Sequence, residues 1–260
     1  MTRPAFIILG AVAIVATVGA CRAAEDREAR PEKSAQPALA APVPPRSAVE
    51  GNDARLRTAF EAVFRRGNGL LRVSDEVTYR FAPGELVESD DGEFLLTPGS
   101  DINVSPVSTG TLGVFLLQDA SDVLAVTGRW PDAIGGSIMG DPPRWSVSRD
   151  FGPRPVVVAT SGGVWQGVAC ETTQLVELTA AGPVALVAFR SLVDQTGASR
   201  GAGAAALDAV QTEGTIENIT PRQGFDVVFR GTPAFVDHYV WDGTTYVRRP
   251  GGASARPLEC

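Results

Sequence analysis

The chain has 260 residues, of which 44% are hydrophobic and 20% are charged, a composition typical of globular proteins. This length suits one large domain or two small ones. The formal net charge is −7, and within residues 51–260 acidic side chains outnumber basic ones. Phosphate backbones and anionic lipid repel an acidic domain, so we expect no nucleic-acid partner and no electrostatic attraction to a membrane.

The first 21 residues have the features of an export signal. Arg3 precedes a mostly apolar run, residues 5–20, which is shorter than the roughly 20 residues that a helix needs to cross a bilayer. The run closes with Val18-Gly19-Ala20-Cys21. These four residues resemble the lipobox of bacterial lipoproteins, in which an aliphatic residue and two small ones precede the cysteine that receives diacylglycerol.

The resemblance implies that residues 1–20 are a signal peptide that is removed, and that lipid on Cys21 holds the protein to a membrane. In enterobacterial lipoproteins, aspartate after the cysteine favours retention in the inner membrane. Arg22 stands there in this chain. We therefore expect the cell envelope, and in a Gram-negative organism the outer membrane facing the periplasm. Two alternatives stay open: an ordinary secretory signal cut after Ala20, and a single-pass anchor.

Residues 21–50 are predicted to be the lipidated cysteine followed by a flexible tether, because the Ala/Pro-rich stretch 36–45 favours extended conformations. The folded domain is predicted to cover residues 51–260 and to open with a helix capped by Asn52. One apolar face recurs at helical spacing, and Gly67 supplies the stop. The residues of that face are Leu56, Ala59, Phe60, Val63 and Phe64.

Beyond Gly69 the pattern favours strands. Residues 77–81 alternate between apolar and polar side chains, and Asp90-Asp91-Gly92 separates two apolar runs as in a hairpin. Further short apolar runs are bounded by Gly, Pro or Asp, at 112–117, 123–126, 156–159, 175–178, 184–189 and 225–229. We predict a mainly β fold, an antiparallel sandwich or barrel-like domain with one N-terminal amphipathic helix. A small or degenerate β-propeller is the alternative, because segments 156–160 and 226–230 are loosely similar.

Two intervening segments are also interpreted. Residues 101–105 alternate oxygen-bearing side chains as in a calcium loop, but Pro106 takes the position of the required glycine, so we interpret them as a strand. The glycine-rich segment 194–214 is predicted to be a long connection with one short helix.

Asp242-Gly243 predicts a two-residue hairpin turn near the end of the chain. This register would pair Trp241 with Thr244 and would place Tyr239, Trp241 and Tyr246 on one face. An aromatic face of this kind is either a binding surface or part of a packed core. We prefer the packed core and keep Tyr239, Trp241 and Tyr246 as a candidate binding surface.

Several kinds of chemistry are excluded by residue counts. Lys33, in the tether, is the one lysine, so the domain lacks a Walker A lysine and a Schiff-base lysine. His238 is the one histidine, so no zinc site built on several histidines exists. Segment 135–140 lacks the glycine spacing of a nucleophile elbow. We assign no catalytic residue, no metal and no cofactor.

Cys170 and Cys260 are the two cysteines left after lipidation of Cys21. In an oxidising compartment an even pair predicts a disulfide, which would tie the C-terminus to the domain. We interpret His238 as a packed or surface residue. The alternatives are a general base and a Cys170–His238 catalytic pair.

These observations predict a non-catalytic envelope protein, anchored by lipid, that binds another protein, a glycan or a small solute. The alternative function is a carboxylate-based hydrolase acting on cell-wall or polysaccharide material, since the chain is rich in acids. In that case four tryptophans would supply stacking platforms for sugars, namely Trp130, Trp145, Trp165 and Trp241.

Overall fold

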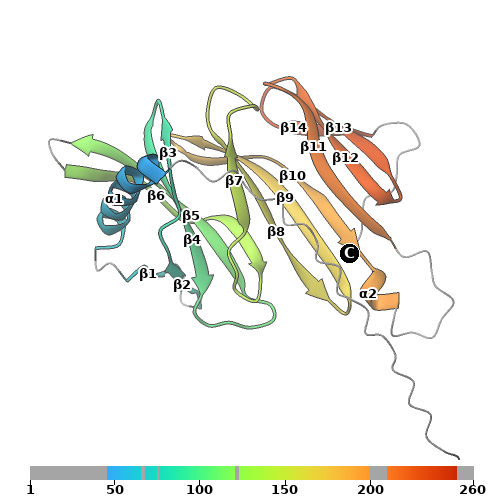
Figure 1. The fold of residues 1–260 in the computed structure, drawn as a ribbon, viewed down its shortest axis with the longest axis horizontal. Coiled ribbons are helices and arrows are strands. Elements are labelled where there is room, and N and C mark those ends of the chain that lie inside the picture. The colour runs from blue at the N-terminus through green and yellow to red at the C-terminus, as the bar shows by residue number, and fades with distance from the viewer. Residues whose placement is uncertain (1–45, 66–67, 75, 121–122, 200–209, 251–260) are drawn as a thin grey trace, which may run out of the picture. The chain divides into compact units, whose positions relative to one another are not determined.

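The computed structural model describes residues 46–65, 68–74, 76–120, 123–199 and 210–250, all within the unit Pro44–Cys260. Within these residues, the strands form two antiparallel sheets, of six and eight strands (Figure 1). The predicted fold class, a mainly β sandwich or barrel-like domain, is therefore confirmed. The propeller alternative is wrong, because strands β7 to β14 follow one another in a single sheet rather than in separate blades.

The first sheet has the order β1-β2-β4-β5-β6, and β3 pairs with β4. The predicted hairpin at Asp90-Asp91 joins β3 to β4, with Ser89 opposite Gly92. The strands are β1 (Leu70–Arg72), β2 (Thr78–Phe81), β3 (Glu85–Ser89), β4 (Gly92–Asp101), β5 (Thr109–Ala120) and β6 (Val123–Ile138).

Both faces of the first sheet are covered, which explains its unbroken apolar runs. Leu95 and Phe115 face helix α1 (Arg46–Val63), whereas Phe94 and Val114 face the second sheet. Successive residues of a strand point to opposite faces, so a strand covered on both sides needs apolar residues at every position. The residues of α1 and of the following turn that pack on this sheet are Ala59, Phe60, Val63 and Phe64 (Figure 1).

The apolar helix face was predicted correctly, but the beginning of the helix was not. The helix begins at Arg46, inside the predicted tether, so Asn52 lies within the helix and does not cap it. A good cap residue does not fix a helix start where the residues before it are also compatible with helix.

The second sheet follows the chain without a crossover, in the order β14-β13-β12-β11-β10-β9-β8-β7. It curls, so that residues from β8 to β14 meet in one aromatic core inside the curl. The strands are β7 (Arg144–Ser148), β8 (Val156–Trp165), β9 (Val168–Thr179), β10 (Gly182–Asp194), β11 (Gln211–Thr220), β12 (Gly224–Thr232), β13 (Phe235–Trp241) and β14 (Tyr246–Pro250).

Strands β8 and β9, together with Trp145 and Val147 of β7, pack on the first sheet. Val157 and Val176 point toward the first sheet, and Val156 and Leu175 point into the curl. The two strands thus contribute to two cores at once.

The predicted register of the last hairpin is wrong by two residues. Trp241 pairs with Tyr246 rather than with Thr244, and residues 242–245 form the loop. The side chain of Asp242 explains the longer loop, because its Oδ1 accepts hydrogen bonds from the amides of Thr244 and Thr245, both at 2.8 Å. A shift of two residues keeps every side chain on its predicted face.

The two remaining predicted segments differ in outcome. The short helix in segment 194–214 is confirmed as α2 (Thr196–Ser199). The interpretation of residues 101–105 as a strand is wrong, because β4 ends at Asp101 and a loop leads to β5. Asp101 Oδ1 accepts a hydrogen bond from the Asn103 amide at 2.9 Å, which turns the chain away from the sheet.

Truncation of Phe115 tests the core between α1 and the first sheet. The ring is fully buried against Phe64, with 5.5 Å between ring centroids. We expect Phe115→Ala to lower the free energy of unfolding in urea by about 3–5 kcal/mol. Val123→Ala, at a residue that is 68% exposed on β6, should change it by about 0.5 kcal/mol or less. Equal stability of the two variants would contradict this description of the core.

Candidate functional site

One cavity lies where the space between the two sheets opens at one end, and we call it the end groove. Its volume is about 830 Å³. Pairing within the second sheet puts Ser161 opposite Thr172, Gly163 opposite Cys170, and Trp165 opposite Val168. On β8 these residues lie at every second position from Val157, and on β9 at every second position from Val176. Alternate residues of a strand share a face, so all of them face the first sheet. The groove therefore continues the core between the sheets.

The groove exists because core side chains become small toward this end. Along the inward positions of β8, Val157 and Ala159 are followed by Ser161 and Gly163. Close packing leaves few voids in protein interiors, so a hollow of this size marks a place that the chain's own side chains do not fill. Ligand sites in proteins have volumes of about 300–1,000 Å³.

Two glycines bring the walls of the groove together. A Cβ at Gly163 would collide with the side chain of Ile138, so this glycine lets β6 approach β8. Gly167, in the β8–β9 turn, has a φ of +83°. A Cβ there would meet the amide nitrogen of Ala198 at 2.6 Å, so this glycine lets α2 lie against the turn. Helix α2 thereby supplies Ala198 to the lining of the groove.

The outer part of the groove exposes apolar side chains. Val107, from the loop between β4 and β5, is 78% exposed, and Trp165 is 62% exposed. Both residues line the groove. Exposed apolar residues that border a concave apolar surface mark an interaction site more often than scattered ones do.

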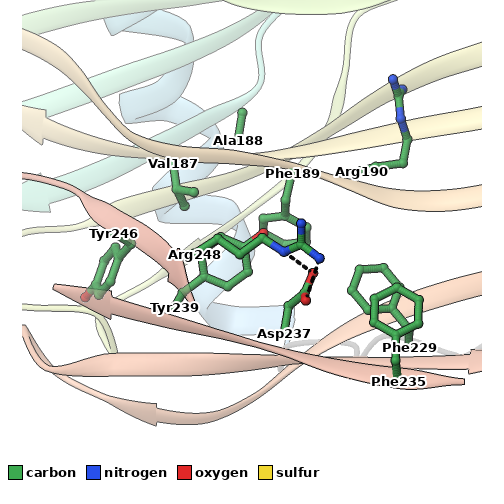
Figure 2. Close-up of a pocket in the computed structure, with 10 residues that line it drawn as sticks. All are labelled: Val187, Ala188, Phe189, Arg190, Phe229, Phe235, Asp237, Tyr239, Tyr246 and Arg248. Atoms are coloured by element: carbon green, nitrogen blue, oxygen red, sulfur yellow. Dashed lines mark hydrogen bonds and ion pairs between the residues drawn. The ribbon is translucent and has the colours of Figure 1, made fainter. Parts of the chain in front are cut away.

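Arg190 lies at the inner part of the groove and is half-buried. It stands opposite Thr172 on the neighbouring strand, and its guanidinium donates a hydrogen bond to the Thr172 hydroxyl at 3.0 Å. Figure 2 shows the Arg190 side chain on the opposite side of β10 from Phe189. The cation therefore points away from the curl.

A second cavity, of about 370 Å³, lies inside the curl of the second sheet (Figure 2). Its lining combines the aromatic rings of Phe189, Phe229, Phe235, Tyr239 and Tyr246 with the ion pair of Asp237 and Arg248, and strand β10 adds Val187, Ala188 and Arg190. We call it the curl cavity.

The ion pair joins neighbouring strands within the curl cavity. Arg248 Nη2 donates to Asp237 Oδ1 at 2.8 Å, and Arg248 Nε lies 2.7 Å from Oδ2. The Asp237 side chain is only 7% exposed. The hydrogen bond to Asp237 raises the pKa of Arg248 above its ordinary value. A carboxylate this deeply buried needs its cation, so we regard the pair as structural.

The candidate binding surface of Tyr239, Trp241 and Tyr246 does lie on one face, and that face is turned inward. Tyr239 and Tyr246 are buried in the core of the curl, and burial raises the pKa of Tyr239 to about 12. Trp241 is half-buried, with the Arg222 guanidinium 4.4 Å from its ring centroid. The burial of these rings agrees with the preferred interpretation, a packed core, and two of them also border the curl cavity.

His238 is a surface residue, as interpreted from the sequence, on the outer face of the second sheet. Its Nδ1 lies 2.6 Å from Asp226 Oδ1, on the neighbouring strand. Asn218 donates a hydrogen bond to Asp226 Oδ2 at 2.8 Å and, together with His238, lowers the pKa of Asp226. Neither His238 nor Asp226 lines one of the two cavities.

Cys170 lies in β9 and lines the end groove. Cys260 lies outside the described residues, so the Cys170–Cys260 disulfide stays a prediction. Cys21 and the rest of the proposed signal and tether up to residue 45 also lie outside the described residues.

Acidic side chains gather in a third hollow, of about 560 Å³, beside the β3–β4 turn. Two of them, Glu93 and Asp119, bind the same guanidinium, that of Arg55, each at 2.9 Å. Hydrogen bonds to Asp119 and Glu93 raise the pKa of Arg55. Among the described residues, no group of three or more His, Cys, Asp and Glu side chains is placed to hold a metal ion.

Sequence reasoning did not identify the groove, although it named Cys170 and Trp165 for other reasons. The usable signal was the decreasing side-chain size at alternate positions of one strand, from Val157 to Gly163. A second signal was Arg190, a charged residue within the apolar run of β10. Neither signal predicts a groove unless the surface that faces these residues is known.

Replacement of one partner tests whether the buried ion pair is structural. We expect Arg248→Met to lower the free energy of unfolding by about 3–5 kcal/mol, because Asp237 is left buried without its cation. The double variant Arg248→Met with Asp237→Leu should recover most of this loss. Arg249→Met is the matched control, since Arg249 is exposed on the outer face beside His238. Similar denaturation curves for the Arg248 and Arg249 variants would contradict a structural role.

Comparison of the chain with models of protein families, with curated proteins and with solved structures found no match. The function is therefore argued below from the cavities and from the chemistry of the residues that line them.

Proposed function

We propose that this chain is a non-catalytic binding protein of the cell envelope, held at a membrane by lipid on Cys21, and that the end groove holds its ligand. The observation that carries the binding role is the apolar lining of an 830 Å³ cavity that the protein's own core does not fill. No helix in the described part of the chain is long and apolar enough to span a membrane. Under the proposal, the acyl chains on Cys21 supply the attachment.

The lining of the groove favours a ligand with substantial apolar surface. Ile138, Val168 and Trp165 offer hydrocarbon and ring surface, and the polar groups are few. An apolar ligand in such a groove gains roughly 25 cal/mol for each Å² of apolar surface removed from water. A guest with apolar surface suits this lining better than a free sugar, whose hydroxyl groups would need hydrogen-bond partners.

The binding role is favoured over the alternative, a carboxylate-based hydrolase. A glycosidase needs two carboxyl groups on either side of the scissile bond. In the described lining of the end groove and the curl cavity, the one carboxylate is Asp237, which is paired with Arg248. Carboxylates gather in the third hollow, where Glu93 and Asp119 are paired with Arg55, and Asp91 with Arg154. Of the four tryptophans considered as sugar platforms, Trp130 and Trp145 pack against the core and Trp241 stacks with Arg222.

A charge placed in the groove tests the site. The probe is N-phenyl-1-naphthylamine, a neutral dye that fluoresces in apolar surroundings, added to the chain from residue 21 with Cys21→Ala so that no lipid or detergent is present. We expect the wild-type groove to bind the dye. Val168→Asp should weaken binding by about tenfold or more, because the bound dye would desolvate the new carboxylate.

Val164→Asp is the matched control for this experiment. Val164 lies in the same hairpin and is 62% exposed, but it points away from the groove. We expect it to leave dye affinity unchanged, with similar melting temperatures for both variants. If Val168→Asp and Val164→Asp bind the dye equally, or if the wild type does not bind it, the groove is not the ligand site.

The anchor has its own test. Cells grown with an alkynyl fatty acid should incorporate the label into the wild-type protein, and Cys21→Ala should lose it, because Cys21 is the proposed acceptor. Cys170→Ala controls for acylation at another cysteine and should keep the label. Equal labelling of the wild type and the Cys21 variant would show that the lipobox assignment is incorrect.

A further inference from the structure

We propose that the ligand of the end groove is a single-chain anionic amphiphile, whose acidic headgroup binds Arg190 and whose acyl chain lies along the apolar part of the groove. This inference rests on the proposed function, since it specifies the chemistry of the ligand in the same cavity. The recognising group is a guanidinium, so the headgroup is a carboxylate or a phosphate, both of which match its fork of donors.

The first observation is the electrostatic state of Arg190. Among the described residues its side chain has one polar partner, the neutral Thr172 hydroxyl, and no carboxylate. Other half-buried arginines of the domain are paired: Arg248 with Asp237, and Arg222 with Glu177. A cation withdrawn from water without an opposite charge is destabilising, and an anionic ligand would offset that cost.

The second observation is the order of polar and apolar rows along the groove. Ser161, Thr172 and Arg190 form one row across the three strands, next to the closed core. The row of Trp165 and Val168 closes the hairpin at the outer end. Val168 lies four residues before Thr172 on β9, which is roughly 13 Å at about 3.3 Å per residue.

This arrangement fixes the orientation of the bound amphiphile. The headgroup lies at the inner row, where Arg190 and the hydroxyl groups offer hydrogen bonds. The hydrocarbon chain runs outward along Ile138, which packs on Gly163, to Trp165 and Val168. A medium-length acyl chain suits this distance.

The experiment is displacement of bound N-phenyl-1-naphthylamine by three probes with the same twelve-carbon chain: dodecanoate, dodecyl phosphate and dodecanol. The protein is again the chain from residue 21 with Cys21→Ala, below the critical micelle concentration of each probe. In the wild type we expect at least one of the two anions to displace the dye at about tenfold lower concentration than dodecanol. This is the scale of a hydrogen bond to a charged group.

Arg190→Gln is the diagnostic variant, and Arg249→Gln is its matched control. We expect Arg190→Gln to remove the preference for the anions, measured within the variant as the ratio of the dodecanol concentration to the anion concentration that displaces half of the dye. Arg249→Gln should keep the preference, since Arg249 is exposed on the outer face of β14. The stronger of the two anions identifies the headgroup as carboxylate or phosphate.

Three results would overturn the inference. The first is a wild type that binds dodecanol as tightly as both anions, and the second is a preference that survives in Arg190→Gln. Both leave the proposed function intact, because the dye still binds the groove. The third is an absence of dye binding by the wild type, which contradicts the proposed function itself and removes the basis for a ligand in this cavity.

Discussion

Strands β8 and β9 are the constraint on which the rest of the structure depends, because each of their faces belongs to a different core. Val157 and Val176 pack against the first sheet, and Val156 and Leu175 pack inside the curl of the second sheet. An antiparallel pair buried on both faces is held by its neighbours as well as by its own hydrogen bonds. The two strands can therefore stay paired along their full length even where one face loses its packing.

The end groove follows from that constraint. Pairing between β8 and β9 continues without interruption to Trp165 and Val168, the residues next to the turn. On the opposite face, Thr160 and Thr173 bond to each other at 3.0 Å near the same end. The hydrogen-bonded ladder thus holds the β8–β9 wall of the groove in place, although the small side chain of Ser161 adds little packing on that face. A preformed wall lowers the entropic cost of binding a ligand.

The fold was largely predictable from the sequence, and the groove was not. Strand positions follow from local patterns, because short continuous apolar runs, such as those at 112–117 and 156–159, indicate buried strands. The register of the last hairpin failed because the side chain of Asp242 competes for two amides, an effect that the Asp-Gly pair alone does not reveal. A cavity between sheets depends on which surfaces meet, and Gly163 lies 25 residues from its contact Ile138. No local pattern carries that information.

The contrast between two arginines gives the strongest indication of which cavity binds a ligand. Arg248 borders the curl cavity and is paired there with Asp237. Arg190 is among the residues that line both cavities, and its side chain points away from the curl (Figure 2). Arg190 borders the end groove with a hydroxyl as its polar partner among the described residues. Burial destabilises an unpaired charge at either arginine. Arg248 has a carboxylate partner, whereas Arg190 has none among the described residues, so an anionic ligand would stabilise it. An anion that also carries hydrocarbon satisfies the cation and the apolar wall together, whereas a neutral apolar guest would satisfy only the wall.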